Sequence, residues 1–265
     1  MIDYSRFKYV KVDKADGICT ITLNRPEALN SFGPVLHPEL EDVFEDVAKD
    51  EEAKVVVLTG AGKAFSAGGD IKEMQRRIVD PTAPRVDIQG ARRLIYNLLG
   101  VQQPIIAAVN GHAVGLGATV ALFCDIVIAA DNARIGDPHV SVGLVAGDGG
   151  AVIWPLLIGI NKAKELLMTG DLLTTAEAER IGLINHVVPA DQVMPKSMEM
   201  AKRLAGGATQ AIRWTKLSVN KVLRERVNLV LETSLGVEFL SMTMDDHAEA
   251  VNAFVEKRAP NYKGS

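Results

Sequence analysis

Two glycine-rich segments could supply main-chain N–H groups to a developing negative charge. The first segment contains Gly60, Gly62, Gly68 and Gly69, and the second contains Gly111, Gly115 and Gly117. Glycine lets a ligand approach the backbone closely, and the second segment also opens a helix, where unpaired N–H groups favour an anion. Two such donors directed at one carbonyl oxygen would stabilise an enolate or a tetrahedral oxyanion. Tight turns would explain either segment alone, but the pair favours the functional interpretation.

Neither segment matches a nucleotide-binding motif. A phosphate-binding loop around Lys63 would need glycine at Val57 and a hydroxyl residue at Ala64. The second segment cannot be aligned with the G-x-G-x-x-G dinucleotide motif. A nucleotide-binding α/β protein therefore stays only as an alternative.

Each glycine segment follows a short apolar run that predicts a buried strand, at residues 55–58 and 104–109. The same reasoning predicts further strands at 19–23, 125–130 and 181–188. Apolar residues at three- and four-residue spacing predict a helix over 35–49, and the second glycine segment leads into a helix over 118–123. This alternation predicts an α/β fold with mostly parallel strands.

The C-terminal part of the chain differs from the rest. Strand signals are almost absent after residue 190, while apolar residues recur at helical spacing between Leu217 and Leu235. Gly206 and Gly207 are expected to interrupt the helical region. We therefore predict a core over residues 1–190 and a helical region over 191–265.

Composition excludes several classes of protein. The chain is 48% hydrophobic and 23% charged, and its 29 basic and 33 acidic residues give a net charge of −4, which is ordinary for a globular protein. Neither nucleic acid nor an anionic membrane is expected as a partner, because both favour a concentrated basic face. Cys19 and Cys124 show no disulfide or metal-ligand spacing. With no signal-peptide or membrane-span pattern, we expect a cytoplasmic protein without a metal.

Five segments, in order, resemble the signature blocks of the enoyl-CoA hydratase/isomerase family, the crotonase superfamily. They are residues 23–30 (LNRPEALN), 64–74 (AFSAGGDIKEM), 108–117 (AVNGHAVGLG), 167–170 (LMTG) and 253–258 (AFVEKR). Each block alone is weakly specific, but the five together cover nearly the whole chain in register.

The resemblance implies a crotonase-like spiral of β-β-α units, with 191–265 as a helical trimerisation region in a homotrimer or dimer of trimers. It implies an acyl-CoA thioester as substrate, as in fatty acid metabolism, and no cofactor besides the CoA that the substrate carries. The oxyanion-hole N–H groups then belong to Gly69 and Leu116. The implied CoA- and substrate-binding residues are Arg25, Ala28, Ala67, Asp70, Ile71, Gly115, Phe254 and Lys257.

The sequence departs from the family at both acid–base positions. Hydratases of this family use two glutamates, and Thr119 and His139 stand at the corresponding places. Adding water to a double bond needs a base and an acid with pKa values near the working pH. An imidazole meets that need, whereas a threonine hydroxyl can only orient water or substrate. Thr119 is therefore assigned to position water and His139 to transfer protons.

Asp148 follows His139 and is flanked by glycines. An Asp-Gly pair is ordinary turn chemistry. The segment from His139 to Asp148, followed by Trp154 and Pro155, also resembles the 6-oxocamphor hydrolase-like branch of the superfamily, which cleaves carbon–carbon bonds with a histidine and an aspartate at this spacing. His37, His186 and His247 are expected to be surface or structural residues.

We therefore predict an acyl-CoA-processing enzyme of lyase or isomerase type. Asp148 would orient His139 or act as a second acid–base group. The alternatives are a hydrolase of a β-diketone carbon–carbon bond or of the thioester, and a catalytically silent CoA-binding protein.

Overall fold

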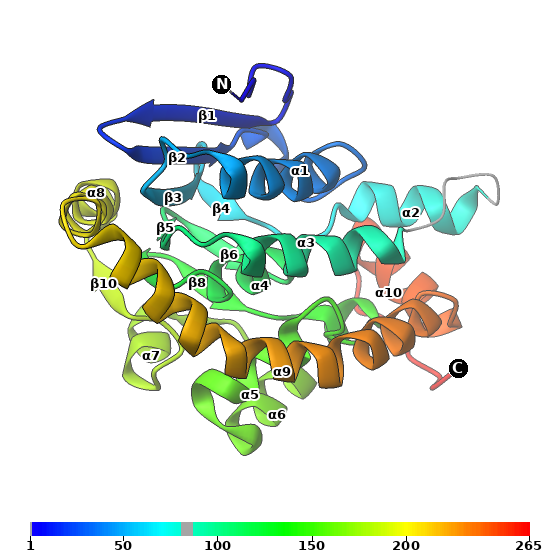
Figure 1. Ribbon diagram of the computed structural model, residues 1–265. Coiled ribbons are helices and arrows are strands. Elements are labelled where there is room, and N and C mark those ends of the chain that lie inside the picture. Colours follow the sequence, from blue (N-terminus) through cyan, green and yellow to red (C-terminus); the bar gives the residue numbers. More distant parts are fainter. Residues whose placement is uncertain (1, 81–86) are drawn as a thin grey trace.

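The computed structural model describes residues 2–80 and 87–265, whose strands form two sheets (Figure 1). The six-stranded sheet has the order β1 (Val10–Ala15), β2 (Ile18–Leu23), β3 (Val55–Gly60), β5 (Ile105–Val109), β7 (Ile126–Ala130) and β10 (His186–Val188). The four-stranded sheet has the order β4 (Ala64–Ser66), β6 (His112–Val114), β8 (Arg134–Gly136) and β9 (Leu173–Thr174). Only the pairs β1–β2 and β8–β9 are antiparallel among these strands, so the predicted α/β fold with mostly parallel strands is confirmed.

A β-β-α unit recurs along the chain and gives the fold its spiral path. The successive units are β3, β4 and α2 (Ile71–Val79), then β5, β6 and α4 (Leu116–Leu122), then β7, β8 and the 3-10 helix η2 (His139–Val142) with α5 (Gly150–Ile158). In each unit the first strand joins the larger sheet and the second joins the smaller one. Because β4, β6 and β8 run parallel, their carboxyl ends share one edge of the smaller sheet, where parallel sheets commonly place binding sites.

The larger sheet is covered on both faces, which explains its continuous apolar strands. Every residue of β3 and β5 is buried. Val56 and Leu58 belong to the core shared with α1 (Leu36–Lys49) and α3 (Ile88–Gly100). Val55 and Val57 face a second cluster that includes residues of α8 (Val193–Ala205). Thus α8, which follows residue 190, packs directly on the sheet.

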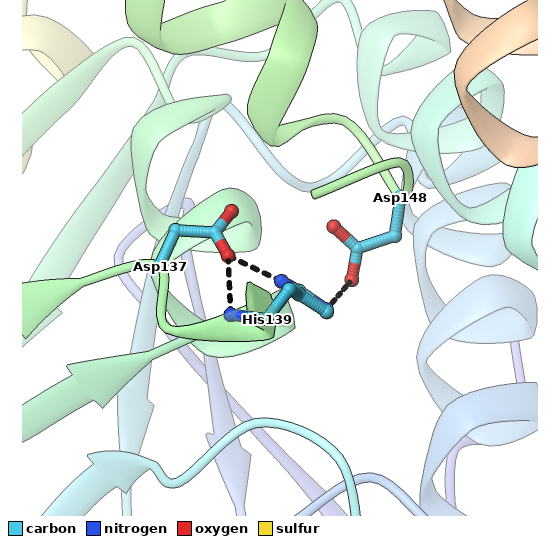
Figure 2. Close-up of side chains that lie close together, drawn as sticks. All are labelled: Asp137, His139 and Asp148. Carbon is cyan, nitrogen blue, oxygen red and sulfur yellow. Dashed lines mark hydrogen bonds and ion pairs between the residues drawn. The ribbon is translucent and has the colours of Figure 1, made fainter. Parts of the chain in front are cut away.

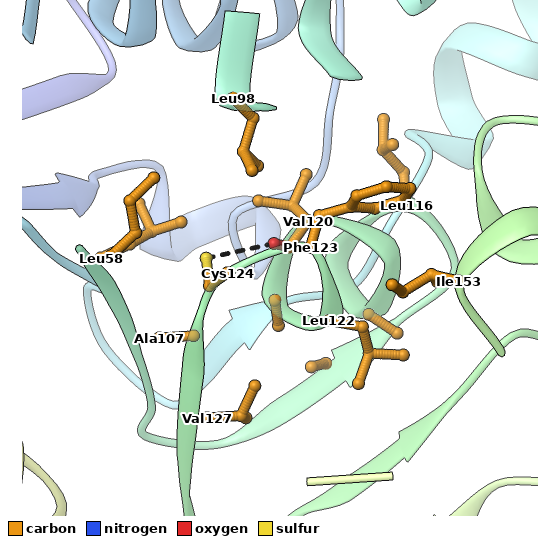
Figure 3. Packing of buried hydrophobic residues seen from close by; sticks show 14 of the residues in the cluster. Leu58, Leu98, Ala107, Leu116, Val120, Leu122, Phe123, Cys124, Val127 and Ile153 are labelled. Carbon is orange, nitrogen blue, oxygen red and sulfur yellow. Dashed lines mark hydrogen bonds between the residues drawn. The ribbon is translucent and has the colours of Figure 1, made fainter. Parts of the chain in front are cut away.

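Helix α4 lies inside the core and carries the second glycine segment into it. Leu116 and Val120 of α4, and Phe123 just after it, belong to the same buried cluster as Leu58 and Leu98 (Figure 3). All seven residues of α4 are buried, so the small residues of this helix let neighbouring elements come close. Cys124 and Cys19 are buried and free, and the Cys124 thiol donates to the Val120 carbonyl at 3.3 Å.

The C-terminal region is helical, as expected, and its break falls at the predicted glycines. Helix α8 ends before Gly206, and α9 (Thr209–Ser241) and α10 (Asp245–Glu256) follow. The remaining short elements are η1 (Pro26–Ala28), α6 (Ile160–Thr169), α7 (Thr175–Arg180) and η3 (Ala190–Gln192). Within the described ranges, no helix combines the length and apolar character needed to cross a membrane.

One predicted strand was too long. The strand expected over 181–188 begins only at His186, because Gly182 adopts a φ of +80° and residues 181–185 form turns after α7. Glycine is the residue that takes this left-handed conformation without strain.

Candidate active site

The two glycine segments contact each other at the carboxyl ends of β4 and β6. Gly68 adopts a φ of +80°, and a Cβ there would lie 2.5 Å from the carbonyl oxygen of Val114. Gly115 adopts a φ of +55°, and its own Cβ would lie 3.9 Å from the Cα of Gly68. Only glycine combines this backbone conformation with so close an approach. The sequence therefore uses these glycines to bring two loops together.

Gly69 and Leu116, the residues that follow this contact, line one cavity of about 270 Å³. No acceptor among the described residues pairs with the N–H of either residue. Leu116 is the first residue of α4, so its N–H is one of the donors that a helix start leaves unpaired. The structure thus places both predicted donors on one cavity.

His139 lines the same cavity. Its ring lies between the carboxylates of Asp137 and Asp148 (Figure 2). Its Nδ1 contacts Oδ1 of Asp137, and its Nε2 lies 3.3 Å from Oδ2 of Asp148. Burial alone would lower the pKa of His139, but the charges of Asp137 and Asp148 outweigh it and raise this pKa well above 6.5. The ring is therefore an imidazolium at neutral pH, and it donates toward a carboxylate from each nitrogen.

Thr119 contacts Asp148 rather than the cavity. Its hydroxyl donates to Oδ1 of Asp148 at 3.3 Å, and the residue is fully buried. Both Asp148 oxygens therefore accept from neighbours, one from Thr119 and one from His139. Gly149 makes this possible, since at φ +125° a Cβ there would lie 2.8 Å from Cγ2 of Thr119. The Asp-Gly turn and a role at the site are thus compatible.

Glu238 of α9 completes the site and was not predicted from the sequence. It lines the same cavity and is only 5% exposed. Its Oε2 is buried and has no hydrogen-bond partner among the described residues. Burial raises the pKa of Glu238 well above 4.5, and the charge of Asp148 raises it further. The surroundings of Glu238 therefore favour its protonated form.

A signal for Glu238 exists in the helical spacing of α9. Val227, Leu231, Ser234 and Leu235 form the buried face of this helix. Glu238 follows them at the three- and four-residue spacing that keeps side chains on one face. An acid in register with a buried face is unusual, so projecting the helix would have found it.

The residues implied for CoA binding fall into two groups. Arg25 and Asp70 form an ion pair, with Nη1 2.8 Å from Oδ2, and Asp70 also caps α2 just before Ile71. Ala28 and Ala67 lie nearby, because the N–H of Ala67 donates to the carbonyl of Leu29, which follows Ala28. Phe254 and Lys257, at the end of α10, are exposed and do not line the cavity. Helix α10 packs against α2, and the role of these residues in CoA binding stays a prediction.

Asp137, His139 and Asp148 could together be considered a metal site. One ligand atom from each lies within 4.8 Å of the others. Each ring nitrogen of His139, however, already faces a carboxylate oxygen, so the imidazole has no lone pair to offer without breaking an ion pair. A buried ion-pair network accounts for the cluster.

The other histidines differ in position. His37 lines the cavity and so has a place at the site beyond the surface or structural one expected. His247 is buried in α10, and its Nδ1 lies 2.7 Å from the carbonyl oxygen of Val142. His186 is exposed in β10.

Comparisons with known proteins identify the family of the chain. The sequence model of the family described as enoyl-CoA hydratase/isomerase matches residues 13–265. A probable mitochondrial enoyl-CoA hydratase of Dictyostelium discoideum is 33% identical over 259 residues, which cover 98% of this chain and 92% of the relative. The 1,2-epoxyphenylacetyl-CoA isomerase of Escherichia coli is 34% identical over 253 residues, 94% of this chain and 95% of the relative.

Solved structures agree as well. The crystal structure of an enoyl-CoA hydratase/isomerase from Mycobacterium paratuberculosis superposes with a TM-score of 0.88 at 36% identity, covering 93% of this chain and 99% of that one.

Proposed function

This chain belongs to the enoyl-CoA hydratase/isomerase family, and from that premise we propose that it hydrates or isomerises an enoyl-CoA thioester in the cavity described above. The N–H groups of Gly69 and Leu116 hold the thioester oxygen. As negative charge accumulates on that oxygen in the enolate, two fixed donors stabilise it more than they stabilise the neutral thioester.

One observation carries the proposal: Asp148 and Glu238 are two carboxyl groups on one cavity whose surroundings differ. Asp148 has partners on both oxygens, since Oδ1 accepts from Thr119 and Oδ2 lies 3.3 Å from Nε2 of His139. Glu238 has an unpartnered buried oxygen and a raised pKa. Two carboxyl groups in such different surroundings suit the separate roles of a base and an acid. The pair could do the work of the two glutamates that the family pattern lacks here.

In hydration, Asp148 takes a proton from water as the water oxygen bonds to the β-carbon of the enoyl group. The electron pair of the double bond moves onto the thioester oxygen, and Glu238 gives its proton to the α-carbon as the carbonyl reforms. His139 contacts Asp148 directly, so the two act as one acid–base unit. In isomerisation the same base removes a proton from one carbon and the acid returns a proton to another.

A hydrolase is the second candidate, and the His139–Asp148 contact favours it. The same unit could activate water against a β-diketone carbonyl or the thioester carbon. The tetrahedral oxyanion that forms would then lie between the Gly69 and Leu116 N–H groups. A catalytically silent CoA-binding protein is the third candidate, and it gives no role to the protonated Glu238.

A substrate panel tests the proposal. The purified protein is assayed with crotonyl-CoA, a β,γ-enoyl-CoA, a saturated acyl-CoA and a cyclic β-diketone. We expect turnover of an enoyl-CoA that falls by about 100-fold or more in Glu238→Gln, the loss typical of a missing acid–base group. Glu232→Gln, an exposed acid on the same helix, is the matched control.

Each other outcome has a distinct meaning. Diketone or saturated-thioester cleavage without enoyl turnover would establish the hydrolase. Thioester binding without turnover of any substrate would establish the silent protein. Enoyl turnover that is unchanged in Glu238→Gln would remove the acid role of Glu238.

A further inference from the structure

The wall of the cavity formed by α1, α2 and α3 carries five polar side chains beside the apolar Pro38, Met74 and Ala91. His37 and Glu41 of α1, Glu73 and Arg77 of α2, and Asp87 at the start of α3 all line it. A purely hydrocarbon acyl chain against this wall would displace water from polar groups and offer them no hydrogen bond in return, which is unfavourable. Pockets that bind ligands usually place a few polar groups where they fix the ligand.

His37 is held in a defined orientation by Glu41. Nδ1 of His37 lies 2.9 Å from Oε1 of Glu41, and the other Glu41 oxygen accepts from Nε of Arg93 at 2.8 Å. The Glu41 side chain is only 5% exposed. With Nδ1 engaged, Nε2 of His37 is the nitrogen left for a ligand, and no described residue pairs with it. An imidazole fixed in this way on a cavity wall can recognise an oxygen-bearing group.

Arg77 offers a donor on the same wall. Its neighbour Arg76 donates to both Glu73 oxygens, from Nε at 2.9 Å and from Nη2 at 2.6 Å. Nε of Arg77 is 3.4 Å from Oε1 of Glu73 and has no hydrogen-bond partner among the described residues. Arg77 thus shares a carboxylate that Arg76 already satisfies, which leaves its guanidinium available to an acceptor in the cavity.

The charges of this wall balance, which bears on the kind of acceptor. Glu73 is paired with two arginines, Arg76 and Arg77, whereas Arg93 is paired with two acids, Glu41 and Asp87. Arg76 and Arg93 lie outside the lining but pair with acids that belong to it, so the three acids and three arginines of this ion-pair group cancel. A wall without net charge offers hydrogen bonds to a neutral oxygen and gives a second anionic group on the ligand no general attraction.

We propose that the acyl group carries a neutral oxygen function, a keto or hydroxyl group, beyond the reacting carbons, and that His37 and Arg77 hydrogen-bond to it. The proposal rests on the proposed function only in taking the cavity as an acyl-CoA site. It makes an oxygenated acyl-CoA, rather than a plain fatty acyl-CoA, the preferred ligand.

Binding of unreactive thioesters tests the proposal without any chemistry. Dissociation constants are measured by titration calorimetry for hexanoyl-CoA, its 4-oxo and 5-oxo derivatives, and the dicarboxylic adipoyl-CoA. We expect one oxo derivative to bind about tenfold more tightly than hexanoyl-CoA, as one or two well-placed hydrogen bonds would give. Hexanoyl-CoA binding as tightly as both oxo derivatives, or adipoyl-CoA binding most tightly, would overturn it.

Variants assign the preference to the named residues. His37→Leu and Arg77→Met should each bring the oxo-to-hexanoyl ratio to within about twofold of one, since each removes a hydrogen bond. His37→Gln, which keeps a polar group at the Nε2 position, should retain part of the preference. Lys72→Met is the matched control, because Lys72 is an exposed cation of the same helix that does not line the cavity, and it should keep the full ratio. An unchanged ratio in both His37→Leu and Arg77→Met would remove these residues from the recognition.

The two proposals fail in different ways. Loss of enoyl turnover with a retained oxo preference would count against the proposed reaction alone. Equal binding of all thioesters would count against the oxygenated acyl group alone. No binding of any thioester would overturn the acyl-CoA assignment of the cavity and the oxygenated acyl group with it.

Discussion

Nε2 of His139 lies 3.3 Å from Oδ2 of Asp148, and the opposite ring nitrogen contacts Asp137. The imidazole thus bridges a buried carboxylate and one that lines the cavity. His139 and Asp148 both line the cavity, and their contact fixes how the two side chains are oriented toward it.

The first prediction concerns His139. His139→Ala should lower kcat on the preferred enoyl-CoA by about 100-fold or more, because Asp148 loses the partner of its Oδ2 and with it the orientation that proton transfer needs. KM should change little, since the thioester oxygen is bound elsewhere. Steady-state kinetics check this, with His186→Ala, an exposed histidine, as the control. Robust turnover in His139→Ala would remove His139 from the acid–base unit.

The second prediction concerns the pH dependence of stability. Burial, aided by Asp148, raises the pKa of Glu238 above its unfolded value near 4.5. The native state therefore holds a proton that the unfolded state has lost, so the free energy of unfolding falls as pH rises above 4.5 and toward the native pKa. When the free energy of unfolding is measured with urea at several pH values in this range, it should fall less steeply with pH for Glu238→Gln than for the wild type. Parallel profiles would show that Glu238 ionises normally in the folded protein.

The third prediction concerns His139, whose raised pKa should cause a second loss of folding stability at higher pH. Its native pKa lies well above 6.5 because of Asp137 and Asp148, although burial opposes them. Its contribution is fully present below 6.5 and is lost as pH rises through the native pKa. In the same urea experiment, His139→Gln should remove only the part of the slope above 6.5. A slope that persists there would have to come from other groups.

The fourth prediction concerns the contact between the glycine loops. Gly68→Ala should destabilise the protein by about 1 to 2 kcal/mol from the left-handed backbone alone, and more because its Cβ would lie 2.5 Å from the Val114 carbonyl oxygen. Activity should fall with it, since the Gly69 and Leu116 N–H groups follow this contact. Gly100→Ala, where a Cβ meets nothing within 4 Å, is the control and should change the melting temperature little.

The fifth prediction concerns the C-terminal tail, which Asp246 holds. Its carboxylate accepts from the N–H groups of Lys263 at 2.7 Å and Gly264 at 2.9 Å, and Tyr262 donates to the Ser141 carbonyl of η2 at 3.0 Å. Asp246→Ala should speed hydrogen exchange in residues 258–265 and in η2, which begins at His139. Asp245→Ala is the control. Unchanged exchange in η2 would show that the tail does not brace it.

The sequence predicted the long, strongly patterned elements well. The strand expected over 55–58 and the helix over 35–49 appear as β3 and α1 with small boundary shifts, because their apolar spacing reflects burial directly. Strands β4, β6, β8 and β9 escaped prediction, since two or three residues are too few to show periodicity. Their positions follow from pairing with one another, which is a property of the folded chain.

The candidate site likewise contains residues that local pattern predicts and residues that only the folded chain reveals. Gly69, Leu116, His139 and Asp148 were predicted from motifs, and the structure brings them to one cavity. Glu238 and His37 were not predicted as site residues, because each comes from a helix distant in sequence and meets the others only through packing. Local pattern identifies loops that carry chemistry, whereas the opposite wall of a cavity requires the tertiary structure.

The carboxyl ends of β4, β6 and β8 lead to Gly69, Leu116 and His139 respectively. In the proposed mechanism, each successive turn of the spiral contributes one part to a shared centre: two turns supply the Gly69 and Leu116 N–H groups, and the third supplies the segment that begins at His139. Because these three parts lie on separate loops, the loop that begins at His139 can change while the loops that carry Gly69 and Leu116 stay the same. This architecture is modular, so a change of reaction need not disturb the recognition of the thioester.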